Sequence, residues 1–200
     1  MNREKPAVTE RTMLESRYNN ARHNILVVFI MTVINMVLLL TGGDSYFLFS
    51  AQVPYDLTVN GMYLCGKLPE EYYEGGYELY EFLPNEFLVI MVSIAAVITL
   101  LYLVFWIFSK KQKVGFMIAA LVLFILDTIS MITSWGAGLD SLLDIVFHVW
   151  VIVSLCLGVS SAAKLKKMPV EETVEVPAEA PAEMQLNGET VTEEKETVSE

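Results

Sequence analysis

Long apolar blocks alternate with short polar stretches along this chain. Four blocks, at residues 24–41, 87–108, 114–134 and 141–163, contain no Lys, Arg or Glu. As α-helices such blocks would extend about 27 to 35 Å, at about 1.5 Å per residue, which matches the hydrocarbon core of a bilayer. The strict alternation typical of barrel strands is missing from a segment such as LVLFILDTISMI. The pattern therefore predicts an all-α polytopic membrane protein with four transmembrane helices in an antiparallel bundle.

Composition agrees with this pattern. A content of 54% hydrophobic residues and a mean hydropathy of +0.48 are hard to reconcile with a soluble domain of 200 residues. The net charge of −11 comes mostly from the flanks and loops, and it excludes a nucleic-acid partner. The first 23 residues are polar, so we expect no secretory signal peptide and a first helix that is retained.

The basic residues predict the orientation, because positive charge near a span is retained in the cytoplasm. Twelve of the 13 precede the first block, separate the second from the third, or follow the fourth, and Lys67 is the exception. Both termini are therefore expected in the cytoplasm of a cell membrane, with segment 42–86 and a tight turn at 135–140 outside. The twelve are Arg3, Lys5, Arg11, Arg17, Arg22, Lys110, Lys111, Lys113, Lys164, Lys166, Lys167 and Lys195.

The two flanks differ in character. Thr12 followed by Glu15 fits a capping box. The first helix is therefore expected to begin within the cytoplasmic segment 1–23, before the membrane. One face of this helix would carry Leu14, Tyr18, Ala21 and Ile25. A frayed tail up to residue 20 is the alternative. Residues 164–200 form a cytoplasmic tail, which from residue 169 lacks aromatic residues and is expected to be disordered and acidic.

The outer segment 42–86 combines ten aromatic residues with eight carboxylates. Aromatic rings with a polar tip favour the membrane interface, so this loop is expected to lie on the outer leaflet or to cap the bundle. Pro54, Asn60 and Gly61 argue against one unbroken helix in its first part. A passive interfacial cap and a ligand-binding lid both remain open.

Cysteine content indicates neither a redox site nor a zinc ribbon. Cys65 and Cys156 are expected on opposite sides of the membrane midplane, where they cannot readily pair. No Cys-x-x-Cys or His-Glu-x-x-His pattern occurs, and we expect no metal and no cofactor.

Five polar residues within the spans form the candidate site. Counted from the outer boundaries, Asn35, Ser93, Asp127 and His148 all lie about 9 to 10 Å deep. Asp127 and His148 can therefore meet if both face inward. Three interpretations stay open: a polar clasp between two helices, a proton or solute pathway, and a metal site built from Asp127, Asp144 and His148. The predicted layer comprises Asn35, Ser93, Asp127, Asp144 and His148.

Small residues mark the inner halves of the last two spans. Ser154, Gly158 and Ala162 recur every four residues, as do Gly115 and Ala119 on the third span. Such small-xxx-small faces let helix backbones approach closely, either within one chain or in a homodimer.

The segments YFLFSAQVPY, FSKKQKVG and LLDIVFHVW resemble small bacterial four-span membrane proteins without assigned function. The resemblance implies the bundle and carries no activity. We therefore expect a non-enzymatic accessory or interaction protein whose partners are the lipid bilayer and a second membrane protein or a second copy. The alternatives are a small proton-coupled transporter or channel that uses Asp127 and His148, and an intramembrane metal-dependent enzyme.

Overall fold

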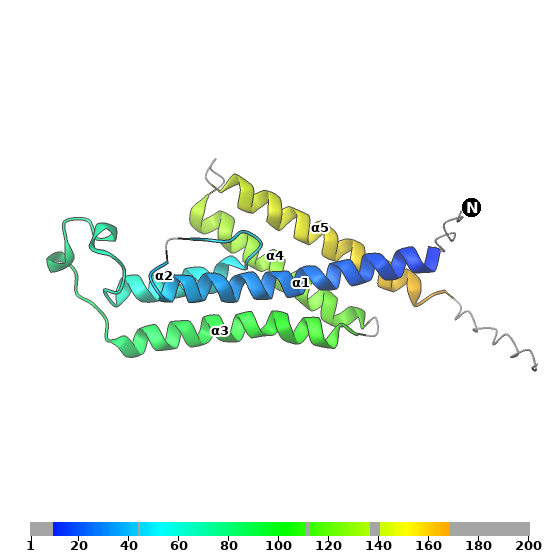
Figure 1. Ribbon diagram of the computed structural model, residues 1–200, viewed down its shortest axis with the longest axis horizontal. Helices are drawn as coiled ribbons and strands as arrows, with labels where there is room; N and C mark the ends of the chain where they lie inside the picture. The colour runs from blue at the N-terminus through cyan, green and yellow to red at the C-terminus, as the bar shows by residue number, and fades with distance from the viewer. Residues whose placement is uncertain (1–9, 44, 111–112, 137–140, 169–200) are drawn as a thin grey trace, which may run out of the picture. The chain divides into compact units, whose positions relative to one another are not determined.

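The computed structural model describes residues 10–43, 45–110, 113–136 and 141–168, apart from the side chain of Trp135 (Figure 1). These residues form five α-helices and two short 3-10 helices, and they contain no strand. Residues 1–9 of the predicted segment 1–23, residues 137–140 of the predicted turn 135–140 and the acidic tail from residue 169 lie outside the described residues. The helices are α1 Glu10–Leu40, α2 Gln52–Leu64, η1 Glu70–Tyr72, η2 Tyr77–Leu79, α3 Asn85–Phe108, α4 Val114–Trp135 and α5 Leu142–Leu165.

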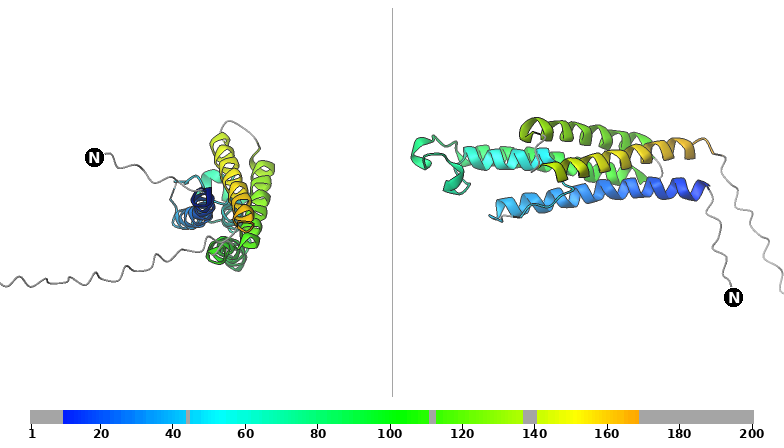
Figure 2. Two further views of the ribbon diagram at one scale, coloured as in Figure 1. Left: turned by 90° about the vertical axis from the view of Figure 1, so that its right-hand side faces the viewer. Right: turned by 90° about the horizontal axis from the view of Figure 1, so that it is seen from above.

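Four of these helices are long and apolar enough to cross a bilayer, which confirms the predicted fold class. They are α1, α3, α4 and α5. The bounds of α3, α4 and α5 agree with the last three predicted spans to within two residues. The beginning of α1 and the end of α5 lie at one end of the bundle, here called the terminal end (Figures 1 and 2). Segment 65–84 lies at the opposite end, here called the cap end (Figure 1).

The first helix runs without a break from the polar N-terminal region into the apolar block. Leu14, Tyr18, Ala21 and Ile25 are all buried, so the predicted face is confirmed and the frayed alternative is wrong. The capping box is wrong as well, because residues 10 and 11 are already helical and Thr12 lies inside the helix. The sequence signal for a cap was local, whereas the helix extends beyond it.

The small residues of α5 face α1 within the same chain. The Nδ2 atom of Asn24 donates a 2.6 Å hydrogen bond to Ser154 Oγ, and Ala162 is buried. A Cβ atom added at Gly158 would lie 2.4 Å from the Cβ of Ala21. This face therefore packs within the chain, which is one of the two predicted interpretations, and a homodimer through these residues stays a prediction. The second predicted face does not pack in this way, because a Cβ at Gly115 would meet nothing within 4 Å.

At the terminal end, α1 closes the end of α3. Arg22 donates from Nε to Ser109 Oγ at 2.9 Å and from Nη2 to the carbonyl oxygen of Trp106 at 3.2 Å. Its guanidinium also lies over the indole ring of Trp106. Carbonyl groups at a helix C-terminus carry partial negative charge, so a cation there stabilises the end of the helix. Tyr18 donates its hydroxyl proton to the carbonyl oxygen of Ser109 in the same region.

The fifth helix, α2, was not expected from the sequence. It is unbroken over Gln52–Leu64, so the argument against one helix in this part of the loop is wrong. Pro54 occupies the first turn, where its missing N–H costs no hydrogen bond. Gly61 allows α2 to approach α3 closely, since a Cβ there would lie 3.0 Å from the Cβ of Met91. Pro54 and Gly61 look like helix breakers in the sequence, but both suit a helix that packs on another helix.

The chain returns into the bundle between α1 and α2. The backbone N–H of Ala51 donates to Thr32 Oγ1 at 2.7 Å, and Thr32 lies eight residues before the end of α1. At about 1.5 Å per residue, α2 thus begins about 12 Å inside the end of α1. Residues 45–64 therefore form a re-entrant segment, which lies deeper than either predicted position of the loop, on the outer leaflet or over the bundle.

Segment 65–84 forms the cap and is packed around aromatic rings. Tyr63 and Tyr73 stack with ring centroids 4.9 Å apart, and Phe82 meets Tyr73 edge-on at 5.4 Å. The hydroxyl of Tyr73 donates to the carbonyl oxygen of Tyr63 at 2.8 Å. Gly66 has a φ of +66° and lies against the ring of Phe82, a place that suits glycine. The cap is thus an ordered unit continuous with α2.

Both cysteines are free thiols. Cys65 is buried beside the cap, where its Sγ lies 3.4 Å from the carbonyl oxygen of Pro84, and Cys156 is exposed on α5. The prediction that they do not pair is confirmed.

Candidate functional site

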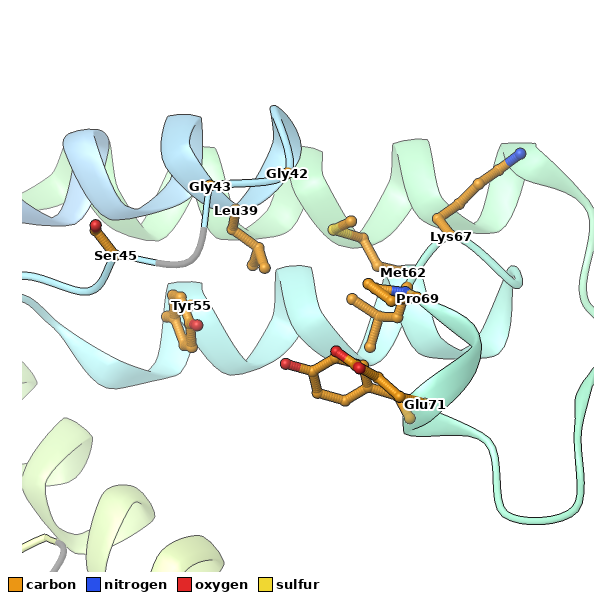
Figure 3. Close-up of a pocket in the computed structure, with 11 residues that line it drawn as sticks. Leu39, Gly42, Gly43, Ser45, Tyr55, Met62, Lys67, Pro69 and Glu71 are labelled. Atoms are coloured by element: carbon orange, nitrogen blue, oxygen red, sulfur yellow. The ribbon is translucent and has the colours of Figure 1, made fainter.

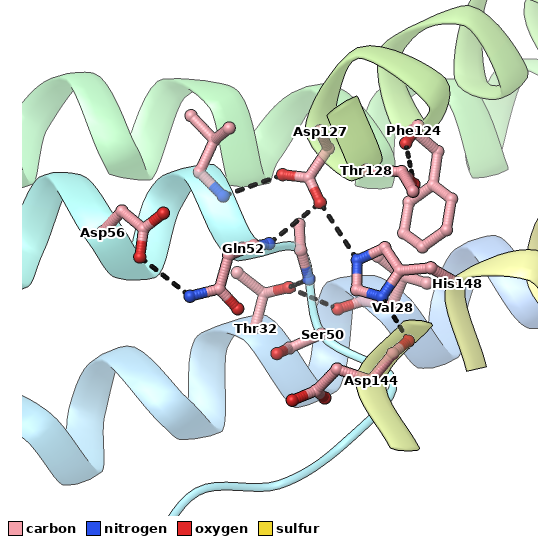
Figure 4. Close-up of polar contacts among 12 residues, drawn as sticks. Val28, Thr32, Ser50, Gln52, Asp56, Phe124, Asp127, Thr128, Asp144 and His148 are labelled. Carbon is pink, nitrogen blue, oxygen red and sulfur yellow. Dashed lines mark hydrogen bonds and ion pairs between the residues drawn. The ribbon is translucent and has the colours of Figure 1, made fainter. Parts of the chain in front are cut away.

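A buried carboxylate holds the first turn of α2 (Figure 4). Asp127 of α4 is 3% exposed. Its Oδ2 accepts from the backbone N–H of Gln52 at 2.9 Å, and its Oδ1 accepts from the N–H of Val53 at 2.8 Å. The local cap residue, Ala51, has no side chain that can accept these bonds. A carboxylate from another helix therefore supplies the capping oxygens that serine or aspartate usually supplies from within the loop.

Every backbone donor at the start of α2 has a defined partner. The N–H groups of Ala51, Gln52 and Val53 bind Thr32 and Asp127, and Pro54 has no N–H. An unsatisfied backbone group in hydrocarbon costs several kcal/mol, so a helix that begins inside the membrane requires such partners. Two side chains from two spans make this re-entrant geometry possible.

The non-helical segment before α2, residues 45–51, is fixed by Asn35. Its Nδ2 donates to the carbonyl oxygen of Phe47 at 2.7 Å and to Ser50 Oγ at 2.9 Å, while its Oδ1 accepts from the N–H of Phe47 at 2.8 Å. Both Asn35 and Ser50 are 1% exposed. The carboxamide thus satisfies both backbone groups of one loop residue, which a carboxylate cannot do because it only accepts.

Phe49, within this segment, adopts a left-handed backbone conformation with a φ of +69°. Such a conformation strains a bulky residue and persists where the surroundings compensate. The ring of Phe49 packs against Phe147 and Trp150 of α5, and the hydrogen bonds of Asn35 and Thr32 flank the turn. The re-entrant turn is therefore held by tertiary contacts on both sides.

His148 meets Asp127 as the sequence predicted. Its Nε2 lies 3.3 Å from Asp127 Oδ2, its Nδ1 lies 2.8 Å from the carbonyl oxygen of Asp144, and the residue is 1% exposed. The ring also stacks on Phe124, with centroids 4.9 Å apart and planes at 12°. The contact joins α4 and α5 beside the start of α2.

The hydrogen-bond geometry assigns one shared proton to this pair. A carbonyl oxygen can only accept, so the Nδ1 of His148 carries hydrogen toward Asp144. The Nε2 then faces a carboxylate oxygen, and two lone pairs would repel unless a proton lies between them. Whether that proton is assigned to His148 or to Asp127, the pair has no net charge. Neutrality as a unit lowers the cost of placing two ionisable groups at membrane depth.

The other two members of the predicted layer differ in position. Ser93 lies apart from the cluster: it is exposed, and its hydroxyl donates to the carbonyl oxygen of Val89 in its own helix. Asp144 takes part through its backbone carbonyl, which lies 2.8 Å from His148 Nδ1, and its side chain is half-buried. Within the part of the chain that the structure describes, no three His, Cys, Asp or Glu side chains are grouped to hold a metal ion. The metal site built from Asp127, Asp144 and His148 is therefore not formed.

Four contributors to the cluster were missed in the sequence. Thr32, Ser50 and Gln52 are buried polar residues, and Tyr46 donates to Gln52 Oε1 at 2.9 Å while sharing a 3.0 Å hydrogen bond with Ser50. Burial, the largest cause, together with the charges of Asp144 and Asp127 and neighbouring Tyr55, raises the pKa of Tyr46 far above its usual value, against the opposing hydrogen bond of Ser50. Tyr46 therefore stays a neutral phenol that can donate. A threonine within a span and three loop residues carry no sequence signal for such a role.

No family model matches this chain, no curated protein is significantly similar in sequence, and no solved structure is significantly similar in fold. The resemblance to small bacterial four-span membrane proteins accordingly stays a prediction.

Proposed function

We propose that this chain is a non-enzymatic accessory or interaction protein of a cell membrane, in which the bundle holds the cap in one fixed position. The observation that carries the proposal is the use of Asp127. Both of its oxygens bind the first turn of α2, and it is 3% exposed. A carboxylate used in this way anchors the re-entrant segment, and its burial keeps its oxygens from contact with a solute. The candidate site is thus a device for positioning α2 and the cap.

The cap offers the surface through which the protein would meet a partner. Leu79 is 74% exposed and Tyr72 is 58% exposed, beside the exposed carboxylates of Glu74 and Glu78. Large apolar side chains that protrude from an acidic surface are typical anchors of protein contacts. The partner is accordingly a protein or domain that is accessible from the cap side.

A photo-crosslinking residue in place of Leu79 tests this role. We expect one discrete protein adduct in the native membrane, because a specific partner would cover this side chain. The matched control is Val89, which is 64% exposed on the lipid-facing side of α3 and should give lipid adducts without a protein band. Equal protein adducts from both positions would contradict a specific surface on the cap.

We also propose that the terminal end is cytoplasmic and the cap end lies outside. The described cations Arg22, Lys110, Lys113 and Lys164 belong to the segments at the terminal end, and Lys67 belongs to the cap. Retention of positive charge on the cytoplasmic side supports this orientation.

Cysteine labelling in intact cells checks the orientation. In a Cys65→Ala, Cys156→Ala background, Leu79→Cys should react with a membrane-impermeant maleimide, whereas Lys164→Cys should react only after the cells are permeabilised. Both positions are exposed in the structure, so a difference in reactivity reports sidedness. Labelling of Lys164→Cys in intact cells would reverse the proposed topology.

The alternative function is a small proton-coupled transporter or channel that uses Asp127 and His148. The observation in its favour is the proton that the hydrogen bonds require between these two residues. Its test is proton flux into vesicles that contain the purified protein and a trapped pH-sensitive dye. The positioning role predicts the same flux as in empty vesicles. A flux that is lost in His148→Gln would instead establish transport.

A further inference from the structure

A groove opens at the cap end, lined by residues other than those of the Asp127 cluster (Figure 3). Its volume is about 440 Å³, within the range of ligand pockets of about 300 to 1,000 Å³. The end of α1, one face of α2 and the beginning of the cap enclose it. Gly42 also lines the groove, and a Cβ there would meet nothing within 4 Å. The apolar side chains of the lining, here called the apolar floor, are Leu39, Met62 and Leu68.

Charges of opposite sign line this groove without neutralising each other. The ion pairs within the described residues join Arg11 to Glu15 and Asp127 to His148, so Lys67 and Glu71 have no ion-pair partner there. In Figure 3 the side chain of Lys67 extends away from Glu71, whose carboxylate lies on the side of Tyr55. The groove therefore offers a cationic contact and an anionic contact at separate places.

Aromatic side chains accompany the anionic contact. Tyr55 and Tyr72 both line the groove, and Tyr46 meets Tyr55 edge-on at 5.0 Å, which fixes that ring. Burial raises the pKa of Tyr55, and the nearby Tyr72 and Asp56 raise it further. Tyr55 therefore stays a neutral phenol, and a carboxylate beside aromatic faces is the arrangement that recognises an ammonium group.

We propose that this groove binds a zwitterionic phosphoethanolamine headgroup, with the ammonium at Glu71 and the tyrosines and the phosphate at Lys67. The groove lies where the last turn of α1 ends, the level at which a span meets the headgroup layer. The apolar floor faces the acyl part of such a lipid. The headgroup belongs to a membrane phospholipid. Free phosphoethanolamine carries the same ammonium and phosphate groups. This site goes beyond the proposed interaction role and does not depend on it.

Lipid titration of the full chain, followed by native mass spectrometry from a neutral detergent, tests the proposal. Phosphatidylethanolamine and phosphatidylglycerol with identical acyl chains differ in the ammonium group, so the former should bind more tightly. Glu71→Gln should weaken its binding about tenfold, as expected for the loss of one charge-assisted contact. Lys67→Gln should also weaken it. The matched control is Glu78→Gln, an exposed carboxylate of the cap outside the groove, which should bind like the unaltered chain.

Soluble phosphoethanolamine as a competitor separates the two sources. Displacement only at concentrations far above that of the lipid supports a lipid site, and displacement at equal concentrations supports a soluble ligand of the same chemistry. Equal affinity for the two lipids, or equal effects of Glu71→Gln and Glu78→Gln, would overturn the proposal. Both glutamates are exposed, so the variants are expected to fold.

Discussion

Replacing Asp127 with alanine is expected to release the first turn of α2 and to lower the free energy of unfolding by about 3 to 5 kcal/mol. The loss is large because the substitution removes three acceptor contacts at once. The N–H groups of Gln52 and Val53 would have no partner at membrane depth, and His148 would lose its carboxylate. Each buried donor that is left without an acceptor lowers the stability of the folded chain by about 1 to 3 kcal/mol.

Denaturation in mixed micelles and hydrogen exchange together check this expectation. The amides of Gln52 and Val53 should exchange much faster in Asp127→Ala, whereas amides in the middle of α3 should stay protected. Asp127→Asn should have an intermediate effect, since an amide retains one oxygen and turns a donor toward the helix start. Ser93→Ala is the control and should change stability by less than about 0.5 kcal/mol, because Ser93 is exposed and bonds within its own helix. Protected Gln52 and Val53 amides in Asp127→Ala would refute the anchoring role.

Substituting Gly158 with alanine is expected to separate α1 from α5 and to destabilise the chain by about 1 to 3 kcal/mol. The added Cβ would lie 2.4 Å from the Cβ of Ala21 and 2.8 Å from Met117 Sδ. The thioether can move, but the α-helical backbone that carries Ala21 cannot yield without opening the interface. The same denaturation measurement gives the change in free energy.

Two further variants make this result specific. Gly115→Ala adds the same methyl group to another helical glycine where nothing lies within 4 Å, so it should be neutral or slightly stabilising. Adding Ala21→Gly to Gly158→Ala removes the opposing Cβ and should restore part of the lost stability despite the weaker helix propensity of glycine. If Gly158→Ala altered self-association and left unfolding of the single chain unchanged, the face would serve a dimer instead.

The sequence predicted the spans because their signal is local and long. Helices such as Asn85–Phe108 and Leu142–Leu165 consist mostly of apolar residues, and each helix satisfies its own backbone hydrogen bonds in hydrocarbon. Length and hydropathy alone then decide where such a helix lies. The meeting of Asp127 and His148 was predictable for the same reason, since equal depth on two successive spans follows from residue counting.

The start of α2 could not be predicted in this way. Its capping groups come from Asp127 and Thr32, which are distant in sequence, while the adjacent Ala51 gives no capping signal. Pro54 and Gly61 resemble helix breakers until the first turn and the contact with α3 are known. Ser93, by contrast, lies at the predicted depth but points away from the cluster, because depth does not determine which way a helix face turns.

The sequence by itself therefore determined the number of spans, the bounds of the last three and the equal depth of Asp127 and His148, all of which follow from the free energy of transferring each segment into hydrocarbon. The tertiary structure decided which polar groups meet and what they hold. A single carboxylate became the cap of a helix 74 residues earlier in the chain. Such a pairing depends on how the helices rotate and pack against one another, and no local pattern of residues encodes that rotation.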